Sequence, residues 1–262
     1  MNLRREIEGL CKRHLGRLPD LENPRGYNDK IQWLKLHDQR REQIKACDKW
    51  AVREMVPERH LIPAKVGIAP DLVPGFVKCT HDSGSARRVR SEHEAKAALD
   101  ALFPRLSSPY GVGKGEWAYR FVPPRLITEK ALDHATDYKF HCVHGRIEWV
   151  QVIWDRGCGT KEAILTPLGR ATDLHMDEKM VHAPAAVSHP GETAWRAMSH
   201  LATRLAQPWR YVRVDLYWSQ GQAWFGELTF WPRAGCYRSK DEAVFGEMLD
   251  IDLIEKLEPI VP

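Results

Sequence analysis

A helical spacing of apolar and polar positions opens the chain. Asn28 can cap one helix that carries an apolar stripe, and Asp48 can cap another that Pro57 must end. The apolar residues in both segments recur at the interval of one helix face. Residues 1–66 are therefore predicted to form a helical N-terminal region.

The pattern changes to that of strands in the next part of the chain. The apolar run 74–78 predicts a buried strand that leads into a polar loop at 79–85. Ser91 and Glu94 then form a capping box ahead of a helix with a clear apolar stripe. A stretch rich in Gly, Pro and Ser follows, which we expect to be mobile. The whole of 67–132 is predicted to form a first lobe.

Antiparallel hairpins dominate the remaining residues, 133–262, which we expect to form a second lobe. Runs rich in β-branched and aromatic residues predict paired strands, and a helix is expected between the two hairpins. No element is predicted within 155–191. Helices mixed with mainly antiparallel strands favour an α+β fold over a doubly wound parallel sheet. The predicted strands are 138–144, 147–153, 211–218 and 222–230.

The second hairpin brings acidic side chains together. Alternate residues of a strand share a face, and a turn centred on Gly221 fixes which residues of the two strands lie opposite each other. Two carboxylates then become cross-strand neighbours. The expected pairs are Asp215 with Glu227, Arg213 with Thr229 and Trp218 with Trp224, and the second strand is expected to show Phe225, Glu227 and Thr229 on one face.

Two opposed carboxylates predict a cation site. Like charges directly across two strands are destabilising unless a positive group lies between them. Magnesium prefers oxygen ligands and takes one or two carboxylates from a protein, so Asp215, Glu227 and the Thr229 hydroxyl are candidate ligands. Arg213 can hold a phosphoryl group with its bidentate fork. The alternative, in which Arg213 only neutralises the two acids, stays open.

Composition and charge narrow the functional classes. With 262 residues, 43% of them hydrophobic and 28% charged, the chain has the make-up of a globular protein. Its net charge is only +4 and its basic residues are scattered, so no nucleic acid partner is expected. The absence of an apolar run of about 18 residues and of a signal peptide predicts a cytoplasmic protein without a membrane span. The six cysteines form no C-x-x-C pair and are predicted to be reduced thiols.

Several strings of the sequence resemble the ATP-grasp superfamily. Arg213-Val-Asp215 and the following Glu227-Leu-Thr-Phe-Trp-Pro232 resemble its R-x-D and E-x-N-x-x-P strands, with Thr229 in the position of the Asn. The strings at 27–37, 137–139 and 226–230 resemble the TupA-like branch of polysaccharide-biosynthesis ligases. The resemblance implies an ATP-grasp fold, in which two α+β lobes with mainly antiparallel sheets clasp a nucleotide.

The same resemblance implies a nucleotide site built from several segments. Lys78 takes the position of the lysine that reaches the α-phosphate, and Arg53 that of a second phosphate-binding cation. The loop after Lys78 is similar to the family's flexible loop over the β- and γ-phosphates, and 128–132 is similar to the hinge between the lobes that receives adenine. The residues implied for the cofactor are Arg53, Lys78, His81, Ser83, Gly84, Ser85, Glu129, Lys130, Ala131, Leu132, Asp137 and Lys139.

The resemblance implies an ATP- and Mg²⁺-dependent carboxylate–amine ligase that forms ADP through an acyl phosphate. Arg213, Asp215, Glu227 and Lys78 would carry the catalysis. The expected partners are small-molecule carboxylate and amine substrates, glycan- or peptide-linked ones included, and a homo-oligomer stays open. The implied product is an amino acid or amine joined to a cell-surface polysaccharide, a peptide or a metabolite precursor. Two alternatives remain: an ATP-grasp phosphotransferase, and a degenerate nucleotide-binding protein without turnover, which Thr229 favours.

Overall fold

The computed structural model describes residues 2–133, 135–156 and 159–251. The chain separates into two compact units, each with its own sheet. Unit 1 comprises Met1–Gln39, Gly113–Gly115 and Ala135–Pro262, and unit 2 comprises Arg40–Val112 and Glu116–His134. Among the described residues, no helix is both long and apolar enough to cross a membrane.

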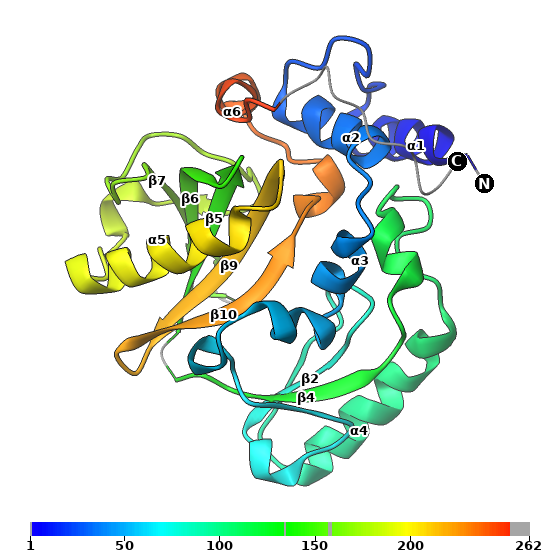
Figure 1. The fold of residues 1–262 in the computed structure, drawn as a ribbon, viewed down its shortest axis with the longest axis vertical. Helices are drawn as coiled ribbons and strands as arrows, with labels where there is room; N and C mark the ends of the chain where they lie inside the picture. Colours follow the sequence, from blue (N-terminus) through cyan, green and yellow to red (C-terminus); the bar gives the residue numbers. More distant parts are fainter. Residues whose placement is uncertain (1, 134, 157–158, 252–262) are drawn as a thin grey trace. The chain divides into compact units, whose positions relative to one another are not determined.

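Unit 2 is built on a four-stranded antiparallel sheet in the order β1-β4-β2-β3 (Figure 1). Helix α4 packs on this sheet, and its apolar stripe joins Val77 and Val89 in one core cluster. The predicted strand 74–78 is confirmed as β2. Ser91 caps α4 as predicted, because its hydroxyl oxygen accepts a hydrogen bond from the Glu94 amide. The elements are α3 (Glu42–Cys47), the 3-10 helix η1 (Ala51–Met55), β1 (Ala64–Val66), β2 (Gly75–Cys79), β3 (Arg87–Val89), α4 (Glu92–Leu102), the 3-10 helix η5 (Trp117–Phe121) and β4 (Leu126–Lys130).

Unit 1 contains a six-stranded sheet in the order β10-β9-β5-β6-β7-β8. Its neighbouring strands are antiparallel, apart from the pair β7 and β8. The two predicted hairpins are confirmed as β5–β6 and β9–β10, whereas β7 and β8 lie in the stretch without a predicted element. The elements are α1 (Leu3–Leu15), α2 (Tyr27–His37), β5 (Thr136–Val143), β6 (Arg146–Trp154), β7 (Lys161–Leu165), β8 (Val181–His182), α5 (Glu192–Ala206), β9 (Tyr211–Ser219), β10 (Gln222–Thr229) and α6 (Glu242–Met248). Mainly antiparallel sheets and N-terminal helices agree with the predicted α+β class.

Alternation along the strands gives this sheet an apolar face and a polar face. Helix α5 covers the apolar face of β5 and β9, where Met198 and Val214 are both fully buried (Figure 1). On the polar face, the Tyr27 hydroxyl of α2 hydrogen-bonds the Tyr211 hydroxyl of β9 at 2.8 Å. His141 of β5 bonds the same Tyr211 hydroxyl at 2.9 Å. One face therefore supplies the core, and the other carries the polar groups.

Two predicted helix caps are wrong. Asn28 lies inside α2, where its buried side-chain amide donates to the Tyr237 carbonyl, and Gly26 precedes the helix. Asp48 follows α3 as its C-cap and accepts a hydrogen bond from the Trp50 amide, ahead of η1. The side chain of Asn28 thus bonds to a distant segment, which a local capping pattern does not reveal.

A buried lysine in α2 joins distant segments of unit 1. The Lys35 ammonium group is fully buried and donates to Gln32 Oε1 at 2.7 Å, to the Lys114 carbonyl at 2.7 Å and to the Ala234 carbonyl at 2.8 Å. A buried charge is costly unless it has hydrogen-bond partners, and these three oxygens provide them. Lys35 therefore fixes α2 to two segments that are far from it in the sequence.

Lys35→Met is expected to lower the free energy of unfolding by about 2–4 kcal/mol, because buried oxygen acceptors lose their donor. Lys12→Met in α1 is the control, since Lys12 is exposed and its loss is expected to be nearly neutral. Chemical denaturation of the two variants measures the difference. Equal losses for both would contradict the role given to Lys35.

Candidate active site

The turn between β9 and β10 sets the pairing of the two strands. Gln220 and Gly221 have positive φ angles of 54° and 75°, as in a two-residue turn of type I′. Such a turn pairs the residues on either side of it, so the register starts one position away from the predicted one. Trp218 therefore pairs with Ala223, and the predicted pairing of Trp218 with Trp224 is wrong.

A β-bulge at Gly226 then shifts the register by one residue. Beyond it, Asp215 pairs with Glu227 and Arg213 pairs with Thr229, as the sequence predicts. A bulge places one extra residue on one strand, so every later side chain of that strand moves to the other face. The bulge is therefore what brings Glu227 and Thr229 onto the polar face of the sheet.

Because of the bulge, the predicted position of Phe225 on the same face as Glu227 and Thr229 is wrong. This residue pairs with Leu216, is 2% exposed and belongs to the apolar face, so it does not share a face with Glu227. Gly226 itself leaves little room for a side chain, because an added Cβ would lie 2.9 Å from the Asp215 carbonyl oxygen and 2.9 Å from Tyr217 Cε2. A glycine at this position thus permits the close approach of the two strands.

Arg213 lies between the two carboxylates. Its guanidinium donates from Nε to Asp215 Oδ1 at 2.6 Å and from Nη2 to Asp215 Oδ2 at 2.8 Å. The same Nη2 lies 3.4 Å from Glu227 Oε1 and 3.2 Å from Thr229 Oγ1. Asp215 is 1% exposed, whereas the Glu227 side chain is 40% exposed. One buried carboxylate and one accessible carboxylate therefore share a single cation.

Strand β5 adds a second cation to this cluster. Lys139 lies directly opposite Asp215, and its ammonium group forms a salt bridge with the Asp215 carboxylate. The same ammonium is 3.1 Å from Asp137 Oδ2, and Arg156 pairs with Asp137 as well. The predicted residues Asp137 and Lys139 are thus part of one charged cluster with Arg213 and Asp215.

These charges set the protonation states around the cluster. Burial alone would lower the pKa of Arg213, but the carboxylate of Asp215 raises it well above its ordinary value. The charge of Asp137, followed by burial, raises the pKa of Tyr217 well above the usual range for a phenol. Burial and the neighbouring cations lower the pKa of His141 well below its ordinary value. Near neutral pH the cluster therefore contains a charged guanidinium, a protonated phenol and a neutral imidazole.

The oxygen atoms around Arg213 fit a hard divalent cation by their chemistry. Asp215, Glu227 and Thr229 all contact one guanidinium group, so a single cation can be shared by all three. Among the described residues there is no cluster of three or more His, Cys, Asp or Glu side chains suited to a metal. Magnesium requires only one or two protein carboxylates, because water and phosphate oxygens complete its shell. These oxygen atoms therefore fit a magnesium ion by their chemistry, and in this structure the guanidinium group of Arg213 is the cation that they contact.

Unit 2 holds a similar arrangement around Glu129 of β4. Lys78 Nζ of β2 is 2.5 Å from Glu129 Oε2, and Arg53 Nη1 is 3.3 Å from Glu129 Oε1. Phe76 pairs with Glu129, so Lys78, two residues further along β2, lies on the same face of the sheet. Burial lowers the pKa of Arg53, and the charge of Glu129 opposes this effect. The two predicted phosphate-binding cations are thus held by one carboxylate that is 8% exposed.

The loop after β2 is fixed at its base by its own side chains. The Ser85 hydroxyl accepts a hydrogen bond from the Cys79 amide at 3.0 Å and donates to Asp82. His81 is 4% exposed, and its Nε2 lies 3.1 Å from the Arg105 carbonyl oxygen. Ser85 is likewise buried, while Ser83 and Gly84 are exposed. The predicted phosphate donors are therefore divided between a fixed base and an exposed tip.

The predicted adenine segment has part of its backbone already bonded within unit 2. The Lys130 amide donates to the Pro63 carbonyl at 3.0 Å, and the Ala131 amide donates to the Pro74 carbonyl at 3.1 Å. Leu132 follows them in a half-buried position. A purine edge would have to use the remaining backbone groups of this segment.

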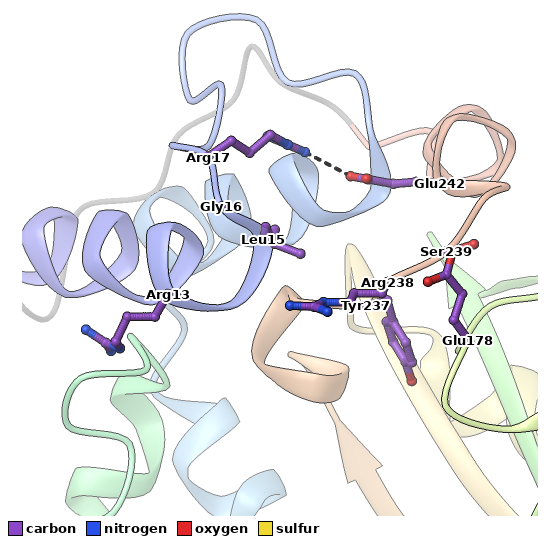
Figure 2. A pocket seen from close by; sticks show the side chains of 9 residues that line it. All are labelled: Arg13, Leu15, Gly16, Arg17, Glu178, Tyr237, Arg238, Ser239 and Glu242. Atoms are coloured by element: carbon purple, nitrogen blue, oxygen red, sulfur yellow. Dashed lines mark hydrogen bonds and ion pairs between the residues drawn. The ribbon is translucent and has the colours of Figure 1, made fainter.

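Unit 1 also has a pocket of about 420 Å³ beside the C-terminal end of α1 (Figure 2). Arg17 bonds Asp29 at 2.6 Å and Glu242 at 3.1 Å, and Arg238 donates to the His14 carbonyl at 3.2 Å and 3.1 Å. Arg17, two residues after α1, thus links α2 to α6, and Arg238 links the last turn of α1 to the segment before α6. Arg17 and Arg238 of this pocket are therefore engaged in contacts that hold the fold together, and we assign no ligand to the pocket.

Two residues join the charged cluster of unit 1 to which the sequence assigned no role in the site. Tyr217 follows Asp215 by two positions on β9, so strand alternation alone places both on one face. Arg156 is the second residue after β6, in the stretch without a predicted element, and its pairing with Asp137 depends on the tertiary fold. The position of Tyr217 thus follows from the strand pattern of the sequence, whereas that of Arg156 does not.

Comparison with known proteins gives a family match over most of the chain. Residues 29–250 match the sequence profile of the family described as "TupA-like ATPgrasp". No curated protein matches the sequence. A similar solved structure is D-alanine–D-alanine ligase from Helicobacter pylori, with 11% identity, a TM-score of 0.49, and coverage of 85% of this chain and 68% of that chain.

Two further solved structures show the same level of likeness. One is D-alanine–D-alanine ligase from Bacillus anthracis complexed with ATP, with 13% identity, a TM-score of 0.44, and coverage of 86% of this chain and 62% of that chain. The other is the biotin carboxylase domain of 2-oxoglutarate carboxylase from Hydrogenobacter thermophilus in complex with MgADP, ADP and bicarbonate. It has 14% identity, a TM-score of 0.45, and coverage of 98% of this chain and 52% of that chain. The chain thus spans less than two thirds of these two proteins.

The sheets of the two units and the matched sequence define the fold class as the ATP-grasp fold. The chain belongs to the TupA-like ATP-grasp family, a branch of the ATP-grasp ligase superfamily. Both assignments agree with the resemblance drawn from the sequence strings.

Gly226→Ala is expected to lower the free energy of unfolding by about 1–3 kcal/mol, because the new methyl group would press on the Asp215 backbone. Gly9→Ala in α1 is the matched control. Its new methyl group would meet the flexible end of Arg13 at 3.3 Å, and alanine favours a helix over glycine by about 1 kcal/mol. Denaturant titration of both variants should give opposite signs, and a stabilising Gly226→Ala would contradict the bulge.

Proposed function

We propose that the protein is an ATP- and magnesium-dependent carboxylate–amine ligase that releases ADP. The observation that carries the proposal is the charged cluster on the polar face of the unit 1 sheet. There, an accessible Glu227 and a buried Asp215 share one cation with Thr229. This donor set suits a nucleotide-bound magnesium ion, and family membership supports the choice of ATP.

In unit 1, Asp215 and Glu227 would hold the magnesium ion, with the Thr229 hydroxyl as a further oxygen ligand. A bound magnesium ion would supply positive charge to the nucleotide phosphates. Arg213, kept beside Asp215, would stabilise the transferring phosphoryl group with its positive charge. Burial would lower the pKa of Arg213, but the carboxylate of Asp215 raises it well above its ordinary value, so the paired side chain is a cation.

In unit 2, Lys78 and Arg53 would bind nucleotide phosphates in exchange for the carboxylate of Glu129. The exposed tip at Ser83 and Gly84 would add backbone N–H groups, which suit phosphate oxygens. The buried His81 and Ser85 would act indirectly, by fixing the base of this loop.

The proposed reaction has two steps. In the first, a substrate carboxylate oxygen attacks the γ-phosphorus of ATP, and the bond between this phosphorus and the β–γ bridging oxygen breaks. This step forms an acyl phosphate and releases ADP. The amine nitrogen then attacks the acyl carbon, phosphate leaves, and the amine loses a proton. Positioning and charge supply most of the catalysis in such phosphoryl transfers, which agrees with a site made mainly of ion pairs.

The family supports a substrate class but no single substrate. We propose that small-molecule acids and amines are joined, as in the attachment of an amino acid or amine to a cell-surface polysaccharide, a peptide or a metabolite precursor. A cytoplasmic location belongs to the same proposal.

A second candidate function is a degenerate nucleotide-binding protein without turnover. It is favoured by Arg213, which already neutralises both carboxylates, and by Thr229 in the place of the family's Asn. Turnover separates the two candidates, because binding alone does not release ADP.

Glu227→Gln is expected to reduce ATP turnover at least about 100-fold and to change the free energy of unfolding by less than about 1 kcal/mol. The side chain is 40% exposed, so its loss affects the site more than the fold. Asp215→Asn is a poorer test, because it removes the partner of two buried cations and is expected to cost about 3–5 kcal/mol of stability. Glu192→Gln, at an exposed ion pair on α5, is the control.

The assay measures ADP release over a panel of acids and amines, with mass detection of the product. ADP release that requires an amine supports the ligase. A phosphorylated product without an amine identifies a phosphotransferase, and nucleotide binding without ADP release identifies the degenerate protein. Full activity of Glu227→Gln would refute the metal assignment.

A further inference from the structure

Both oxygens of the Asp215 carboxylate are engaged by cations. Oδ1 accepts from Arg213 Nε at 2.6 Å, and Oδ2 accepts from Arg213 Nη2 at 2.8 Å and from the Lys139 ammonium group. The carboxylate is 1% exposed, so water does little to screen these contacts. Asp215, a predicted metal ligand, is therefore paired with two cationic side chains, Arg213 and Lys139.

This arrangement opposes the binding of a metal ion by itself. A divalent ion at either oxygen would lie beside an ammonium group and a guanidinium group, and like charges at short range disfavour each other strongly in a buried site. Removing water from the site makes that repulsion larger. Metal binding at Asp215 thus requires at least one of the two cations to move away.

Lys139 is the cation that is better suited to move. Arg213 is held by a planar, bidentate contact and also reaches Glu227 and Thr229, whereas Lys139 is a point charge on a flexible stem. Lys139 also lies 3.1 Å from Asp137, which is paired with Arg156 as well. If Lys139 leaves, Arg156 still neutralises Asp137 and Arg213 still neutralises Asp215.

We infer that Lys139 couples metal binding to nucleotide binding: it holds Asp215 while nucleotide is absent, and it moves to a nucleotide phosphate when ATP binds. In the first position it weakens the affinity of Asp215 for a metal ion. In the second it vacates Asp215 and neutralises a phosphate with the same charge. The inference rests on the proposed function, since it assumes that the site takes a nucleotide together with a divalent ion.

The test uses Mn²⁺ alone and ADP alone on the full chain. Mn²⁺ binding is followed by the loss of the free-ion EPR signal, and ADP binding is measured by calorimetry in EDTA. Lys139→Met is expected to bind Mn²⁺ at least about tenfold more tightly than the unmodified protein, because a competing positive charge is gone. The same variant is expected to bind ADP at least about tenfold more weakly, because a phosphate partner is gone.

Opposite signs for the two ligands distinguish coupling from a structural role, which would weaken both. Lys161→Met, at a partly exposed ion pair on β7, is the control and should leave both affinities unchanged. Adding Asp215→Asn to Lys139→Met should abolish the gain in Mn²⁺ affinity. If Lys139→Met does not fold, as judged by circular dichroism, Lys139→Gln takes its place with the same expectations.

Unchanged or weaker Mn²⁺ binding by a folded Lys139 variant would overturn the inference, and so would unchanged ADP binding. The proposed function fails by a separate result, namely that the unmodified protein neither binds MgATP nor releases ADP with any acid and amine. A protein that turns over ATP while Lys139→Met leaves Mn²⁺ affinity unchanged would retain the function and lose the coupling.

Discussion

The buried carboxylate of Asp215 is the constraint on which the polar face of unit 1 depends. A carboxylate that is 1% exposed must be paired, because an isolated charge in a low-dielectric interior costs several kcal/mol. Arg213 and Lys139 provide that pairing from its own strand and from the neighbouring strand. Once this pairing is required, the positions of Glu227, Thr229 and Asp137 follow, because they contact the same two cations.

Unit 2 meets the same constraint with different residues. Glu129 forms salt bridges with Lys78 and Arg53, as Asp215 does with Arg213 and Lys139. Each unit by itself therefore has one buried carboxylate that is paired with two cations. Such pairs contribute little to stability compared with apolar residues of similar size, because desolvation offsets much of the attraction. Their placement is therefore better explained by a function that exchanges a carboxylate partner for an anionic ligand. Phosphate oxygens are such anions, and they prefer lysine and arginine.

The sequence pattern predicted the α+β class, both hairpins and the capping box of α4, because each depends on local spacing. It also predicted the pairing of Asp215 with Glu227, but from a continuous register that the structure does not show. The type I′ turn at Gln220 and Gly221 starts the register one residue away, and the bulge at Gly226 restores it. A glycine inside a strand pattern is a known sign of a bulge, so this signal was present. The buried lysine Lys35 gave no such signal, because two of its three acceptors, the carbonyls of Lys114 and Ala234, lie far from it in the sequence.

The exchange of the family's Asn for Thr229 does not by itself remove the chemistry of the site. The Thr229 hydroxyl oxygen accepts a hydrogen bond from Arg213 Nη2 at 3.2 Å, so it keeps the guanidinium oriented as an amide oxygen would. What a nucleotide-bound cation needs from the protein is an accessible carboxylate, and Glu227 supplies one with a side chain that is 40% exposed. Under the proposed function, Thr229 orients Arg213 and Glu227 receives the metal, so turnover is expected to depend on Glu227 more than on the side chain at position 229.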